Sequence, residues 1–209
     1  MPNFQKESNR PMKIVERSSV GSVMVLSILL VCFAFGFSLV PRVAAQGEYV
    51  GVKKCRVCHM PQANAWEKTK MSKVFELLKP GVAAEVKKAH KIDPEKDYTK
   101  DSSCLQCHTT GYGKGGFKDI ESTPDLAGVT CEACHGPGGG YLKDDLMSLK
   151  NKEFKRADVQ AAGLVIPDAK TCANCHNEKS PFVEKGAPFD FEKRKAQGTH
   201  EHFALKYKH

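Results

Sequence analysis

The pattern of apolar and polar positions divides the chain into an apolar N-terminal segment and a long, more polar remainder. Residues 19–40 are almost uninterruptedly apolar and follow a polar stretch with four basic side chains. Pro41-Arg42 and three small or apolar residues ending at Ala45 come next. This order is typical of a secretory signal, so we predict that residues 1–45 direct export and are cleaved off. Because the apolar stretch is long for a signal, an uncleaved membrane anchor is the alternative.

Helical periodicity in residues 46–209 is confined to short stretches. The longest spans residues 61–78, where apolar positions share one helical face between Pro61 and Lys79-Pro80-Gly81. Shorter helical patterns lie at residues 83–90, 158–163 and 189–196. Turn-rich connections separate these stretches. The pattern therefore predicts one mainly α-helical domain over residues 46–209, with extensive loops.

The apolar content of residues 46–209 is too low for an ordinary core. Val, Ile, Leu and Phe together make up less than a fifth of these residues. That fraction is close to the range in which a chain cannot bury enough apolar surface to fold. A fold with a large aliphatic core and a transmembrane bundle are both excluded. Material other than aliphatic side chains must supply much of the core.

A five-residue motif, Cys-x-x-Cys-His, occurs four times in residues 46–209, and we number these copies motif 1 to motif 4. The cysteine pairs are Cys55 and Cys58, Cys104 and Cys107, Cys131 and Cys134, and Cys172 and Cys175. The histidines that follow them are His59, His108, His135 and His176. This is the attachment sequence of c-type haem. Each thiol adds to one vinyl group of the haem, and the adjacent imidazole binds the iron.

Other uses of paired cysteines explain the pattern less well. Disulfides suit an exported chain but do not require a histidine after every pair. Structural zinc sites do not repeat one uniform five-residue unit, and a thioredoxin-like dithiol occurs once, beside an α/β pattern. We therefore predict four covalently bound haem c groups, whose porphyrins form much of the core. Glycines at residues 111–116 and 136–140 would let the backbone pass close to a porphyrin face.

The positive charge of the chain does not indicate nucleic-acid binding. The formal net charge is +8, but the lysines are dispersed, as on a solvated surface, and haem propionates offset much of it. Nucleic acid is not an expected partner. Contact with a membrane is expected only through the signal or anchor segment.

Four histidines outside the motifs are candidates for the second axial position of the irons. They are His90, His200, His202 and His209. His90 ends the helical pattern at 83–90. In an extended segment His200 and His202 would point to the same side, with their rings roughly 6–7 Å apart. They are then too far apart to bind one iron together, so we expect one to bind a haem of its own chain and the other a second haem, in the same chain or a neighbouring subunit.

Met71 is a further candidate axial ligand. It lies on the apolar face of the predicted helix at 61–78. A methionine at such a position more often packs in a core, and we expect Met71 to pack against a haem.

The motifs and the segments around them resemble a known family. They include the sequence from Gly128 to Gly138 and the ending from Cys175 to Glu192. Together they are similar to the tetrahaem cytochromes c typified by the nitrifier cytochrome that accepts electrons from hydroxylamine oxidoreductase. Residues 97–113 and 199–203 resemble the branch from metal-reducing bacteria, which includes the outer-surface cytochrome OmcE that polymerises into filaments.

The resemblance implies a mainly helical fold, closely packed haem pairs and two histidine ligands per iron. In the filament-forming relative, one distal histidine comes from the adjacent subunit. One position departs from the family pattern: members often carry a ligand histidine in Trp-x-x-Ser/Thr-x-His, whereas here Met71 stands five residues after Trp66.

Three functions fit these features. The first is electron transfer between redox partner proteins, in the periplasm or at the outer cell surface. The second is the same relay polymerised into a conducting filament, with an extracellular metal oxide as an acceptor. The third is a haem enzyme that reduces or oxidises a small nitrogen compound at an open iron. Four spare histidines and the absence of a Cys-x-x-Cys-Lys motif favour electron transfer over an enzyme.

Overall fold

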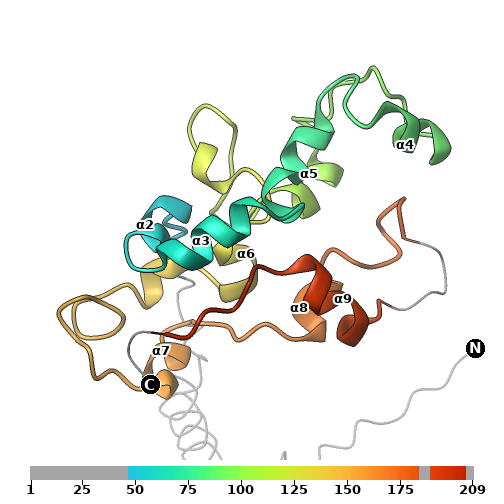
Figure 1. Ribbon diagram of the computed structural model, residues 1–209. Helices are drawn as coiled ribbons and strands as arrows, with labels where there is room; N and C mark the ends of the chain where they lie inside the picture. Colours follow the sequence, from blue (N-terminus) through green and yellow to red (C-terminus); the bar gives the residue numbers. More distant parts are fainter. Residues whose placement is uncertain (1–46, 184–188, 206–209) are drawn as a thin grey trace, which may run out of the picture. The chain divides into compact units, whose positions relative to one another are not determined.

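The computed structural model describes residues 47–183 and 189–205, which form short helices joined by long loops (Figure 1). Within these residues no β-strand occurs, and one isolated bridge joins Thr109 to Ala127. The predicted signal segment at residues 1–45 and the candidate ligand His209 lie outside the described residues. Of the helices in the described part, none is long and apolar enough to cross a membrane.

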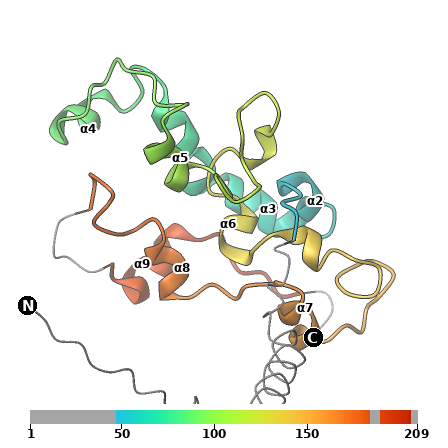
Figure 2. The same ribbon diagram turned by 180° about the vertical axis from the view of Figure 1, so that it is seen from behind.

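The helices are short and evenly distributed along the chain. In order they are α2 (Val52–Arg56), α3 (Met60–Glu67), the 3-10 helix η1 (Met71–Leu78), α4 (Ala84–Ala89), α5 (Ser102–His108), η2 (Pro124–Leu126), α6 (Cys131–His135), η3 (Gly138–Gly140), α7 (Arg156–Ala161), α8 (Ala169–Ala173) and α9 (Phe191–Gly198). In the two views of Figures 1 and 2, α8 and α9 lie below the segment from α3 to α5. The predicted mainly helical class with extensive loops is confirmed.

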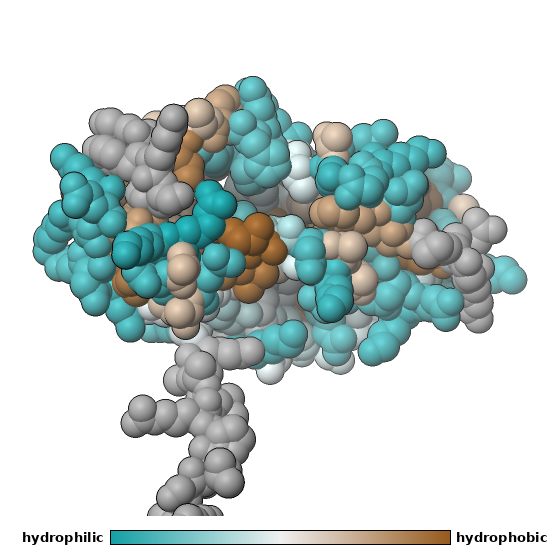
Figure 3. All heavy atoms as spheres, turned by 90° about the horizontal axis from the view of Figure 1, so that it is seen from below, coloured by the Kyte–Doolittle hydropathy of each residue, from teal (hydrophilic) through white to brown (hydrophobic). Residues whose placement is uncertain are grey.

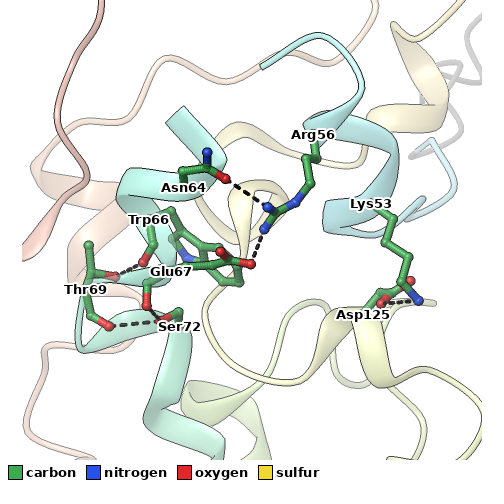
Figure 4. A network of polar contacts seen from close by, with 8 residues as sticks. All are labelled: Lys53, Arg56, Asn64, Trp66, Glu67, Thr69, Ser72 and Asp125. Atoms are coloured by element: carbon green, nitrogen blue, oxygen red, sulfur yellow. Dashed lines mark hydrogen bonds and ion pairs between the residues drawn. The ribbon is translucent and has the colours of Figure 1, made fainter. Parts of the chain in front are cut away.

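The single helix predicted for residues 61–78 is wrong, because the chain forms α3, a short break and then η1. Side-chain hydroxyls explain the break (Figure 4). Thr69 Oγ1 donates to the carbonyl of Trp66 at 2.7 Å, and Ser72 Oγ donates to the carbonyl of Glu67 at 3.0 Å. These hydroxyls bind the carbonyls that a continuous α-helix would use for its own N–H groups.

The three shorter predicted helices are confirmed as α4, α7 and α9, with α7 and α9 displaced by two residues. The displacement of α9 follows from its N-cap. The side chain of Asp190 accepts a hydrogen bond from the backbone N–H of Lys193, so the helix begins after Asp190 rather than before it.

A small hydrophobic cluster connects η1, α5 and η2. Its buried members are Phe75, Leu78, Leu105, Phe117 and Leu126. The rings of Phe75 and Phe117 lie 5.4 Å apart, between centroids, and are tilted by 55°. This cluster supports α5, the helix that carries motif 2.

Phe75→Ala is expected to lower the free energy of unfolding by about 3–5 kcal/mol, because it removes a buried ring and leaves a cavity. Denaturant unfolding of the haem-loaded protein measures this. Leu149 is 66% exposed, so Leu149→Ala serves as the control and should change stability by no more than about 0.5 kcal/mol. Equal effects of the two substitutions would show that the cluster contributes little.

The glycine-rich loops contact the segment at residues 47–50. A Cβ on Gly138 would lie 2.8 Å from Cγ2 of Val50, and a Cβ on Gly111 would lie 2.6 Å from the ring of Tyr49. The N–H of Gly139 donates to the carbonyl of Glu48 at 2.9 Å. The backbone at these glycines is thus closely approached, as expected. The neighbour in the described structure is the segment at residues 47–50, whereas the sequence pattern predicts a porphyrin face.

Candidate haem-binding site

Each motif forms about one helical turn. Motif 2 lies at the end of α5 and motif 3 fills α6, whereas motifs 1 and 4 run from α2 and α8 into the following turn. In motifs 1 and 4 the same bond closes the turn: the N–H of His59 donates to Cys55 O, and the N–H of His176 donates to Cys172 O, both at 2.9 Å. One helical turn brings residues three positions apart to the same face, as attachment of both thiols to one porphyrin requires.

The eight motif cysteines are free thiols in the structure. Cys58 is exposed and the other seven are partly exposed. Among the described residues, no three or more His, Cys, Asp or Glu side chains are arranged to hold a metal ion.

Backbone carbonyls orient two of the motif histidines. Nδ1 of His108 lies 2.6 Å from the carbonyl oxygen of Val74, and Nδ1 of His135 lies 3.2 Å from that of Val165. When Nδ1–H donates to a carbonyl, the other ring nitrogen, Nε2, keeps its lone pair for a metal ion. Burial lowers the pKa of both imidazoles, which favours the neutral form that can bind iron.

Thiols of different motifs lie next to each other: motif 1 lies beside motif 3, and motif 2 lies beside motif 4. The thiols of Cys55 and Cys131 interact directly, which raises the pKa of Cys55 and lowers that of Cys131. Burial, together with the nearby thiol of Cys107, raises the pKa of Cys175 to about 12. In each case the two thiols come from different motifs, so these motifs lie side by side.

An electrostatic interaction links these two pairs of motifs. Burial, followed by the charge of Cys172, raises the pKa of Cys134 to about 11. This places the second cysteine of motif 3 near the first cysteine of motif 4. The contacts thus connect the motifs in the order 1, 3, 4 and 2.

The residues of these motifs fit c-type haem. The thiols are free, they are paired on single turns, and two of the motif imidazoles are oriented with one nitrogen available. The described residues also leave many large apolar side chains exposed, among them Val57 at 68% and Met60 at 56%, both next to cysteines or histidine of motif 1. On the face seen in Figure 3, hydrophobic side chains gather in two areas on either side of a hollow. A porphyrin covers apolar surface of this kind.

His90 has the same hydrogen-bond pattern as His108 and His135. Its Nδ1 lies 3.0 Å from the carbonyl oxygen of Pro181. Its ring meets that of Phe182 edge to face, with 4.8 Å between centroids. His90 is therefore held with Nε2 available, although it lies outside the motifs.

His200 and His202 lie side by side, with 4.9 Å between ring centroids, closer than the extended spacing predicts. Nδ1 of His200 lies 2.7 Å from the carbonyl oxygen of Glu201. Burial and then the charge of His200 lower the pKa of His59, and both tail histidines contribute to the lowered pKa of His135 after burial. The two rings thus lie near motifs 1 and 3 of their own chain.

A pocket of about 470 Å³ separates α3 from the tail at residues 197–203 and is lined in part by Lys68 and His200. Met71 does not line it. The terminal methyl carbon of Met71 would lie 3.4 Å from a Cβ on Gly198, at the end of α9. The side chain of Met71 therefore lies beside the end of α9.

The carbonyls of Val74, Val165 and Pro181 were not predicted as part of the site. They contribute through the backbone, so their side chains carry no signal in the sequence. Contacts between motifs are similarly absent from the sequence pattern, because they join residues far apart in the chain.

Four haem-attachment turns on a mainly helical scaffold define a multihaem c-type cytochrome. The sequence profile of the family described as "Cytochrome c554 and c-prime" matches residues 54–136. Cytochrome c-554 of Nitrosomonas europaea is 34% identical over 206 residues, which covers 88% of each chain. The solved structure of reduced cytochrome c554 from Nitrosomonas europaea is 35% identical and matches with a TM-score of 0.62, covering 78% of this chain and 89% of that one.

The chain belongs to the cytochrome c554 family. It is a multihaem electron-transfer cytochrome, and its cofactors are four haem c groups with their irons. The predicted family, fold class and cofactor are confirmed at this level.

Proposed function

We propose that this cytochrome relays electrons between redox partner proteins through four haems, attached at the cysteine pairs of motifs 1 to 4. The motif histidines serve as proximal ligands, and the protein acts after export, in the periplasm or at the outer cell surface. One observation carries the proposal: interactions between thiols of different motifs place all four motifs near one another in one series. Haems attached at neighbouring thiols lie close together, so an electron can pass along them without bond chemistry.

The order of the contacts sets the order of the relay. The series begins at motif 1, passes through motifs 3 and 4, and ends at motif 2. The haems at motifs 1 and 2 are then the sites of electron entry and exit. When bound, the haems supply the reversible one-electron chemistry, and the chain holds them in sequence and tunes their potentials.

We propose His90, His200 and His202 as distal ligands. For His90 the support is the orientation by Pro181, which matches that of the motif histidines. For His200 and His202 the support is their position beside motifs 1 and 3. His209 stays a candidate from sequence for the remaining iron. The side chain of Met71 lies beside the end of α9, which supports a packing role rather than a ligand role.

Filament assembly is a more specific version of the proposal. In a filament, one of the two tail histidines would bind a haem of a neighbouring subunit, and an extracellular metal oxide would be the final acceptor. Because both rings lie near motifs of their own chain, ligation within one subunit is better supported. We therefore propose a relay that functions as a single subunit and treat filament assembly as the alternative outcome of the test on His200 and His202.

Electron paramagnetic resonance of the oxidised protein at neutral pH tests the coordination. Most irons are expected to be low-spin, since imidazoles are available on both sides. Met71→Leu is expected to leave the spectrum unchanged, because the side chain only packs, while His90→Ala should turn one iron high-spin. A new high-spin signal in Met71→Leu would make Met71 a ligand. A dominant high-spin signal in the unmodified protein would favour an enzyme acting on a small nitrogen compound at an open iron.

A further inference from the structure

Glu132 is a buried carboxylate inside motif 3, next to Cys131. It is only 2% exposed. Its Oε1 accepts hydrogen bonds from the N–H groups of Val50 at 2.9 Å and Gly138 at 2.7 Å, and its Oε2 accepts one from Gly51 at 2.8 Å. An ionised carboxylate has only acceptors, and three N–H donors stabilise that charged form. Glu132 therefore carries a negative charge in the interior.

The carboxylate of Glu132 has no ion-pair partner among the described residues. Among the ion pairs of the described residues none includes Glu132; the nearby bases pair elsewhere, Lys53 with Asp125 and Arg56 with Glu67 (Figure 4). Burying an unpaired charge is unfavourable, and amide donors offset that cost only in part. Haem attachment does not require a carboxylate at this position, because the other three motifs have no acidic residue between their cysteines.

The charge lies between motifs 1 and 3. Two of its donors, Val50 and Gly51, directly precede α2, which carries motif 1. The Cys55 thiol interacts with that of Cys131, the neighbour of Glu132 in the chain. After burial, the charge of Glu132 also raises the pKa of Tyr49, so its field extends beyond its own hydrogen bonds.

We propose that Glu132 is a fixed negative charge that lowers the reduction potentials of the haems attached at motifs 1 and 3. The inference rests on the attachment sites of the proposed function. On reduction a haem would take up one electron from a redox partner or from the preceding haem of the series, Fe(III) would become Fe(II), and the carboxylate would stay ionised. A nearby negative charge favours the ferric form, and it acts more strongly in the interior than in water. Electrons are then driven from motifs 1 and 3 toward motifs 4 and 2.

Glu132→Gln tests the charge in the fully haem-loaded protein. In a redox titration followed by visible absorption and electron paramagnetic resonance, we expect the reduction equilibrium of two of the haems to shift toward Fe(II) by about tenfold, or about 59 mV for a one-electron couple. The remaining haems should keep their midpoints. Glu67→Gln is the matched control: it also removes a carboxylate near motif 1, but that side chain is 52% exposed and its field is screened by water and salt. It should leave all midpoints unchanged.

Glu132→Asp separates charge from structural support. It keeps the charge but shortens the side chain, so the thermal midpoint should fall while the potentials stay low. If Glu132→Gln lowers the thermal midpoint and moves no potential, Glu132 is only a structural anchor and the proposal is overturned. If the Glu132→Gln protein cannot be produced, the Glu132→Asp protein provides the test. A tenfold shift of the reduction equilibrium in the Glu132→Asp protein would then overturn the proposal. Fewer than four haems in the unmodified protein would instead contradict the proposed function, and the mass of the same sample reveals this.

Discussion

A protein in which serine replaces both Cys131 and Cys134 is expected to carry three haem groups instead of four. A hydroxyl cannot replace a thiol in the addition to a haem vinyl group, so motif 3 would lose covalent attachment. The mass of the intact exported protein gives the haem count, and extraction with acidic acetone removes any haem that is not covalently held. The fold should also be strongly destabilised, because a porphyrin supplies part of the core of a chain with few aliphatic residues.

Motif 3 is the most informative motif to remove, because its thiols interact with those of both motif 1 and motif 4. Its loss should interrupt the relay as well as lower the haem count. The matched control replaces Cys55 and Cys58 with serine at the end of the series, which should also remove one haem but leave the connection from motif 3 through motif 4 to motif 2. Electron exchange among the remaining haems, followed after partial photoreduction, distinguishes the two variants. A motif 3 variant that keeps four covalent haems would contradict the assignment.

The Cys-x-x-Cys-His motifs can be recognised in the sequence because each is local. Two thiols and an imidazole within five residues need only one helical turn to adopt their geometry. The helices at α4, α7 and α9 are local in the same sense, and their patterns predicted them to within two residues. The hydroxyls of Thr69 and Ser72, by contrast, broke a helix whose apolar periodicity alone appeared continuous.

The rest of the site depends on contacts between distant residues. The carbonyl that orients His108 belongs to Val74, and the donors that hold Glu132 include Val50 and Gly51, more than eighty residues earlier in the chain. No spacing rule connects such positions. The sequence identified His90 as a ligand candidate by counting histidines, but its orientation by Pro181 is visible only in the folded chain.

The second large effect is expected at His200 and His202, and separate alanine substitutions should each turn one iron high-spin. The sequence predicts that these two histidines bind two different haems, since two rings separated by one residue cannot share an iron, and it leaves open whether the second haem belongs to the same chain or to a neighbouring subunit. The fold favours the same chain, because His200 acts electrostatically on the histidines of motifs 1 and 3, and His202 acts on that of motif 3. Each histidine can then bind a different haem without a neighbouring subunit.

Sedimentation and electron paramagnetic resonance on the same samples separate the two arrangements. If both ligands act within one chain, the parent protein and both variants should sediment as monomers, and the high-spin signals of the His200→Ala and His202→Ala proteins should differ. Phe203→Ala, beside them in the tail, is the control and should keep all irons low-spin. If one tail histidine instead binds a neighbour's haem, the parent should form filaments, and the substitution of that histidine should leave monomers, each with one open iron at the former interface.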